Sequence, residues 1–177
     1  LQTSFGANVL ALKNGMPTQL GTREILETFI SYRIEVIIKR TTYDLLKAKE
    51  KEHILLGLAV AIENIDEMID LIKNSKDAND AQSKILKRKW SAKNLVGLLK
   101  TNIDKRLSEI ISNFTYLSVE QAKAILELRL QRLTGLEREK VEKDLLEEAK
   151  KISDYLSILA SEAKIKKIIQ NELEEIR

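Results

Sequence analysis

The sequence predicts an all-α protein: a long antiparallel coiled-coil arm with a small helical head, plus a short N-terminal β-hairpin. Charged residues make up 32% and apolar residues 44% of the 177 residues, with one proline and six glycines. This balance is typical of long helices and coiled coils. Aromatic residues are only 5% of the chain, which argues against a thick globular core. Two long stretches with a helical pattern of apolar residues bracket a more varied middle segment.

The N-terminal segment, residues 1–21, contains the only β-like pattern. A short apolar run, residues 9–12, leads into Asn14-Gly15, a dipeptide that favours hairpin turns, and residues 16–20 can form the returning strand. Two strands alone are marginally stable in water. We therefore expect this hairpin to be the end of a larger domain, and the chain, which begins with Leu1, to be a piece of a longer protein.

Residues 22–74 are expected to form the first long helix of the arm. Thr22 is a candidate N-cap, and Gly57 is the only glycine in a stretch without proline that extends to about residue 75. Apolar residues recur every three or four positions near its end, as at Leu58, Ile62 and Ile65. At 1.5 Å per residue, a helix over residues 22–64 would be about 60 Å long. We expect Gly57 to allow close helix packing, although a flexible point is the alternative.

Residues 136–177 are expected to form the returning helix. The capping-box pattern of residues 134–137 opens it, and we expect it to continue unbroken to the end of the chain. Its apolar residues alternate spacings of three and four, which predicts a coiled-coil seam. The seam consists of Ala149, Ile152, Leu156, Leu159 and Ala163.

Residues 75–135 are expected to form the helical head. Ser118 and Gln121 form a second capping-box pattern, and the helix that follows carries apolar residues around more than one side. Such a helix contacts both its own domain and a further surface, which we expect to be a second copy of the chain. The alternative is that these leucines only close the head's own core. The candidate dimer contacts are Ile125, Leu128, Leu133 and Leu136, with Arg129 and Arg132 at the polar edge.

A basic segment near the start of the head is the candidate DNA contact. Eight basic residues and one acidic residue, Asp104, lie in the segment from Lys84 to Arg106. Basic clusters bind phosphates through counterion release, without reading sequence. A solvated surface is the plainer alternative. The candidate contacts are Lys84, Lys87, Arg88 and Lys89, whereas Trp90 is expected to pack onto the head.

Catalytic, metal and cofactor sites are not predicted. The chain has no cysteine, and its only histidine, His53, has no evident second ligand. Its four tyrosines, at positions 32, 43, 116 and 155, are expected to be packing residues rather than nucleophiles. No apolar run approaches the length of a membrane span. The net charge of +3 is too small to argue for nucleic acid by itself.

Several blocks resemble the A subunits of bacterial type IIA DNA topoisomerases. LSVEQAKAILELRLQRLTGLEREK, residues 117–140, is similar to the exit-gate segment of gyrase and topoisomerase IV A subunits. Residues 22–75 resemble the outgoing coiled-coil helix through Arg33, Lys39-Arg40-Thr41, His53-Ile54-Leu55 and Asn64-Ile65-Asp66, and residues 1–20 resemble the end of the tower domain. Residues 78–116 depart from the shortest members by forming a longer head. The blocks, in this order, are closest to those of gyrase.

The resemblance implies a structural part of an enzyme that passes one DNA duplex through a break in another. The head would form a C2 homodimer at the exit gate, and the passed duplex would leave between the arms. The catalytic tyrosine would lie before Leu1, and the partner B subunit would supply ATP hydrolysis and Mg²⁺, in the cytoplasm. The alternatives are a topoisomerase IV equivalent, a coiled-coil scaffold without a DNA role, and a free-standing nucleic-acid-binding arm.

Overall fold

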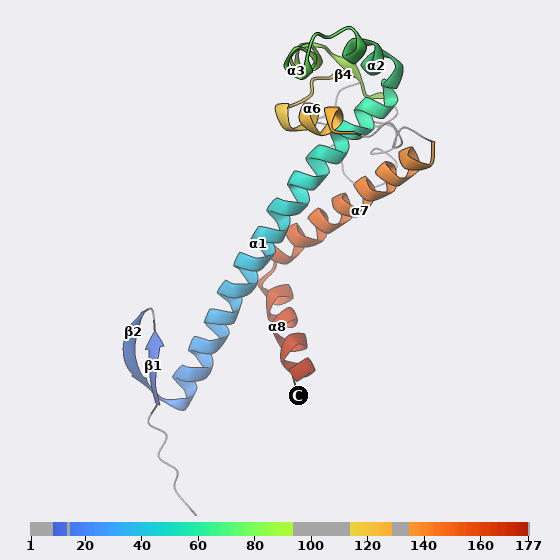
Figure 1. Cartoon of the computed structure of the whole chain (residues 1–177). Coiled ribbons are helices and arrows are strands. Elements are labelled where there is room, and N and C mark those ends of the chain that lie inside the picture. The colour runs from blue at the N-terminus through green and yellow to red at the C-terminus, as the bar shows by residue number, and fades with distance from the viewer. Residues whose placement is uncertain (1–8, 14, 94–113, 129–134, 177) are drawn as a thin grey trace, which may run out of the picture. The chain divides into compact units, whose positions relative to one another are not determined.

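The computed structural model describes residues 9–13, 15–93, 114–128 and 135–176. Within these residues it contains six helices and two two-stranded sheets (Figure 1). The chain forms two compact units, Leu1–Asp44 with Tyr155–Arg177 (unit 1) and Leu45–Asp154 (unit 2). The predicted predominance of helix is therefore confirmed. None of the helices in the described part of the chain combines the length and apolar character that a membrane span requires.

The predicted hairpin is present in unit 1. Strand β1 (Val9–Lys13) pairs antiparallel with β2 (Met16–Leu20), with Lys13 opposite Met16 and Val9 opposite Leu20. Gly15 in the turn has a φ of +78°, a left-handed conformation that glycine adopts without steric cost. Helix α1 (Thr22–Glu63) follows directly. Thr22 is its first residue rather than its cap. Gly21 occupies the position before the helix, where its carbonyl accepts from the Ile25 N–H and its N–H donates to the Glu24 carboxylate, both at 3.0 Å.

The predicted helix over 22–74 is wrong as a single element, because it divides at Asn64. Helix α1 ends at Glu63, and α2 (Ile65–Lys73) begins after Asn64. The Asn64 amide donates to the Val60 and Ser91 carbonyls, both at 2.8 Å, and its oxygen accepts from the Ser91 N–H at 3.2 Å. Asn64 therefore ends one helix and fixes a strand from a later part of the chain.

The core of unit 2 surrounds the single tryptophan. Helix α3 (Ala78–Lys87) leads to strand β3 (Trp90–Ser91), which pairs with β4 (Phe114–Thr115) ahead of α6 (Val119–Leu126). Figure 1 shows α2, α3, β4 and α6 gathered around the end of α1. Trp90 is 1% exposed, and its indole N–H donates to the Ile85 carbonyl at 3.0 Å. The prediction that Trp90 packs onto the head is confirmed.

The predicted returning helix also divides, at residues 160–161. Helix α7 (Gly135–Leu159) and helix α8 (Glu162–Ile176) are separate, and the Ser161 hydroxyl accepts from the Lys164 N–H at 3.4 Å at the start of α8. The break changes which residues are buried. Ala149 and Ile152 of the predicted seam are buried, but Ala163 is exposed, and Ile165 and Ile169 are buried after the break.

Unit 1 is held together by an apolar cluster and a carboxylate with two guanidinium partners. Ile37 of α1 packs with Ile165 and Ile169 of α8. Beside them, Glu172 accepts hydrogen bonds from Arg40, at 2.7 Å, and from Arg33. The Arg40 hydrogen bond is the main cause that lowers the pKa of Glu172 below its ordinary value. Burial and charge therefore act together to pair the two helices.

A second apolar stripe of α1 lies on a different side of the helix from Ile37. Its members recur at heptad spacing and are exposed or half-buried: Ile25, Phe29, Tyr32, Val36 and Tyr43. Tyr32 and Tyr43 are 62% and 56% exposed, and Tyr116 in unit 2 is 57% exposed, whereas Tyr155 is half-buried. The prediction that all four tyrosines pack is therefore wrong for three of them.

Close packing between α1 and α6 in unit 2 depends on Gly57. A Cβ atom at this position would lie 2.6 Å from Gln121 Cγ, well inside van der Waals contact. Gln121 is itself 7% exposed and donates its amide to the main-chain carbonyl of His53 at 2.7 Å. The prediction that Gly57 allows close helix packing is confirmed.

We expect Gly57→Ala to lower the free energy of unfolding by up to about 2 kcal/mol. Overpacking costs about 1–3 kcal/mol, which exceeds the gain of about 1 kcal/mol in helix propensity. Urea unfolding followed by fluorescence of Trp90 would measure the change, because this tryptophan lies in the same core. In a Gln121→Ala background the alanine should cost less, since Cγ and Cδ of residue 121 are gone and only its Cβ, at 2.7 Å, still lies too close. Equal costs in both backgrounds would contradict the account.

Unit 2 also contains an almost fully buried carboxylate between α1 and α7. The Glu148 side chain is 5% exposed and pairs with Lys51 at 2.7 Å and with Lys151 at 2.9 Å. Burial alone would raise the pKa of Glu148, but the hydrogen bonds from both lysines outweigh it, so the pKa is lowered. The ionised form of Glu148 therefore favours the folded state.

We expect Glu148→Gln to lower the free energy of unfolding at pH 7 by about 1–3 kcal/mol, the usual value of charge-assisted hydrogen bonds. Because the folded-state pKa is lowered, this stabilisation is present above the ordinary pKa of 4.5 and is lost as pH falls through the folded value. The difference between native chain and variant should therefore shrink in acid. Urea unfolding from pH 7 to pH 3 measures it, with the exposed Glu147→Gln as the control. A difference that stays constant with pH would refute the assignment.

Candidate functional site

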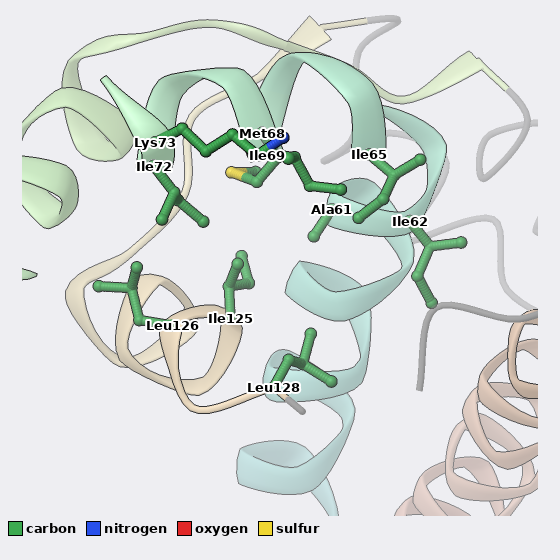
Figure 2. Close-up of a pocket in the computed structure, with 10 residues that line it drawn as sticks. All are labelled: Ala61, Ile62, Ile65, Met68, Ile69, Ile72, Lys73, Ile125, Leu126 and Leu128. Carbon is green, nitrogen blue, oxygen red and sulfur yellow. The ribbon is translucent and has the colours of Figure 1, made fainter. Parts of the chain in front are cut away.

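An apolar pocket in unit 2 is the principal candidate site. It has a volume of about 330 Å³ and is bounded by the end of α1, by α2 and by α6 (Figure 2). Nine of its ten lining residues are apolar, and Lys73 is the only charged one. Figure 2 shows Ile72 and Met68 of α2 facing Ile125 and Leu126 of α6 across the pocket, with Leu128 at its lower edge.

Helix α6 is positioned by the predicted capping box, which the structure confirms. The Ser118 hydroxyl accepts from the Gln121 N–H at 3.2 Å, and the Gln121 side-chain oxygen accepts from the Ser118 N–H at 2.9 Å. The Ser118 hydroxyl also lies 2.8 Å from His53 Nε2. His53 is exposed. These bonds fix the start of α6 against α1 and so set the width of the pocket.

The predicted dimer contacts are distributed between the core, the pocket and undescribed positions. Ile125 is 4% exposed and belongs to the core of unit 2, although it also borders the pocket. Leu128 is half-buried at the pocket edge. Arg129, Arg132 and Leu133 lie outside the described residues, as does the side chain of Leu136 in the first turn of α7. Their role in dimerisation stays a prediction.

The predicted DNA contacts divide into one residue with a local structural role and three exposed ones. The Lys84 ammonium lies 2.6 Å from the Asp80 carboxylate and donates to the Asn74 carbonyl at 3.2 Å, so it secures the connection between α2 and α3. Lys87, Arg88 and Lys89 are exposed. We refer to these three, with Tyr116, as the basic surface.

Tyr116 is the member of the basic surface that sequence reasoning missed. Lys89 Nζ lies 5.6 Å from the centre of its ring. The signal in the sequence was weak, because 26 residues separate the two positions and only the pairing of β3 with β4 brings them together. Arg88 in turn lies 5.0 Å from the centre of the Trp90 ring and pairs with Glu67.

No cluster of metal-binding side chains occurs among the described residues. Within residues 9–13, 15–93, 114–128 and 135–176, no three His, Asp or Glu side chains are placed so that they could hold an ion. The candidate site consists of an apolar pocket and a basic surface, which suit binding to macromolecules.

Comparison with known proteins identifies the family. The family model for the A subunit of DNA gyrase/topoisomerase IV matches residues 1–174. The DNA gyrase A subunit of Rickettsia conorii is 44% identical over 177 residues, and those of Granulibacter bethesdensis and Haemophilus influenzae are 43% and 42% identical over 178 and 184 residues. All of this chain is covered in each case, but only 19–21% of the relatives' length. The chain belongs to the family of DNA gyrase/topoisomerase IV A subunits.

Proposed function

We propose that this chain is the exit-gate segment of a gyrase A-type subunit, in which two copies meet through the head and a DNA duplex leaves between them. The observation that carries the proposal is the apolar pocket between α2 and α6. Three of its lining residues, Ile125, Leu126 and Leu128, belong to residues 117–140, the segment whose sequence most resembles the exit gate. Family membership supports it, because a topoisomerase needs surfaces that dimerise and release DNA.

The size and chemistry of the pocket suit a contact that forms and opens repeatedly. A gate must hold two copies together, yet separate once in each cycle of strand passage. A modest apolar patch with charged residues at its edge meets both needs better than a large obligate interface. Lys73 lines the pocket, and Arg129 and Arg132, which follow Leu128 in the sequence, are the predicted remainder of such an edge.

Within this proposal the chain's role is mechanical. The arm formed by α1 and the returning helices would carry the head, and the reaction would take place in other parts of the protein. A gyrase B-type partner would supply ATP hydrolysis and Mg²⁺, and the assembly would work on chromosomal DNA in the cytoplasm. A topoisomerase IV equivalent is the second candidate, but the three relatives compared above all belong to DNA gyrase.

We expect the native chain to dimerise at micromolar concentrations and Leu128→Glu/Leu133→Glu to be a folded monomer. A carboxylate at each position would have to lose its hydration on dimerisation without gaining a partner, which weakens association at least tenfold. Sedimentation equilibrium across micromolar concentrations measures the association, and circular dichroism shows whether the variant is folded.

Leu46→Glu is the matched control. Leu46 lies in the same unit, is 56% exposed and is remote in sequence from the head. A charge there should leave the dimer intact. A native chain that stays monomeric, or two variants that weaken association equally, would exclude the head as a self-sufficient gate contact.

A further inference from the structure

We propose that the basic surface, formed by Lys87, Arg88, Lys89 and Tyr116, is a contact for the phosphate backbone of double-stranded DNA. The inference rests on the proposed function, in which a duplex approaches the head. The three basic residues are consecutive and exposed, and no acidic residue occurs in the sequence from Ala81 to Lys93. Such a surface attracts phosphates by releasing their counterions and carries no sequence preference.

Lys89 is held in place by an aromatic ring. Its ammonium lies 5.6 Å from the centre of the Tyr116 ring, which is 57% exposed. A cation–π contact at an exposed site is weak, but it favours one orientation of a long side chain. Lys89 therefore loses less conformational freedom on binding a phosphate than an unrestrained surface lysine. Tyr116 acts as a positioning residue for this cation.

Arg88 is ordered in a similar way on a more rigid support. Its guanidinium carbon lies 5.0 Å from the centre of the Trp90 ring, and that indole is buried and hydrogen-bonded to Ile85. Its partner Glu67 is 59% exposed, and exposed ion pairs contribute little stability. A phosphate can therefore replace Glu67 while Arg88 stays stacked on Trp90.

Helix electrostatics explain only part of this surface. Basic residues in the last turn of a helix are favoured by the helix dipole, which accounts for Lys84 and Lys87 of α3. Arg88 is the cap residue and Lys89 follows it, so both lie at or beyond the end of the helix. Both lie against aromatic rings contributed by β3 or by the residue after β4.

The partner that these features favour is a duplex rather than a single strand. Arg88 and Lys89 use aromatic rings as supports, so they present charge outward, which suits phosphates. Single-strand binding depends instead on bases stacking upon aromatic faces. With Lys89 over its ring, Tyr116 offers that face less readily.

Fluorescence anisotropy with a labelled 30-base-pair duplex, between 50 and 300 mM salt, tests the inference on the full chain. Lys87→Gln/Arg88→Gln/Lys89→Gln should weaken binding by about a hundredfold or more at 50 mM and reduce the magnitude of the slope of log K against log salt by about 2–3, since each phosphate contact contributes about 0.9. Lys87→Gln/Lys89→Gln, which keeps the stack of Arg88 on Trp90, should reduce the magnitude of the slope by about 2. Tyr116→Ala should weaken duplex binding about twofold to fivefold, whereas Tyr116→Phe should bind like the native chain.

Lys49→Gln/Lys143→Gln/Lys150→Gln is the matched control, because it removes the same charge from exposed positions on α1 and α7 of unit 2. This control should reduce the magnitude of the slope by less than about 1. Equal losses in both triple variants, no duplex binding by the native chain, tighter binding of a single strand of equal length, or equal affinity for polyglutamate would each overturn the proposal.

Sedimentation of the same variants separates this inference from the proposed function. The basic surface and the apolar pocket are lined by different residues, so the variants should dimerise like the native chain. If the variants dimerise and also bind duplex as tightly as the native chain, the basic surface is rejected as the DNA contact while the exit-gate proposal is retained. A native chain that binds duplex through the basic surface but stays monomeric would reject the self-sufficient gate alone.

Discussion

The side chain of Gln121 is the point on which the arrangement of unit 2 depends. One amide group caps its own helix through Ser118, donates to the His53 carbonyl in α1 and fills the space that Gly57 leaves open. Three contacts from one buried residue fix both the position and the direction of α6. Because α6 forms one wall of the apolar pocket, the geometry of the candidate interface follows from this single side chain.

Asn64 has the corresponding role on the opposite wall. By ending α1 and pairing with the main chain of Ser91, it directs α2 across the core and fixes β3 next to it. The short pairing of β3 with β4 then brings Tyr116 to Lys89. Two polar side chains, each satisfied in more than one direction, thus connect the core of unit 2 to both candidate binding surfaces.

Local signals in the sequence predicted most of the helices and strands. The features that the sequence did not predict depend on contacts between distant parts of the chain. The hairpin and the capping box at Ser118 follow from short-range chemistry, and both were predictable. The breaks at Asn64 and Ser161 were not, because the apolar period continues through both of them. The break at Asn64 depends on its hydrogen bonds to Ser91, which lies 27 residues later. The basic residues of the candidate site were evident in the sequence. The hydrogen bonds of Lys84 to Asp80 and Asn74, and the approach of Tyr116 to Lys89, became visible only in the structure. The side chains of four of the six predicted dimer contacts lie outside the described residues.

The exposed stripe of α1 has a consequence for handling the molecule. Phe29, Tyr32 and Tyr43 present aromatic surface at the heptad spacing that helices use to recognise one another. Left uncovered in water, such a stripe promotes colloidal self-association through a face that has nothing to do with the head. Concentration, salt and crowding would then change the apparent assembly state of the chain without any change in its gate contact.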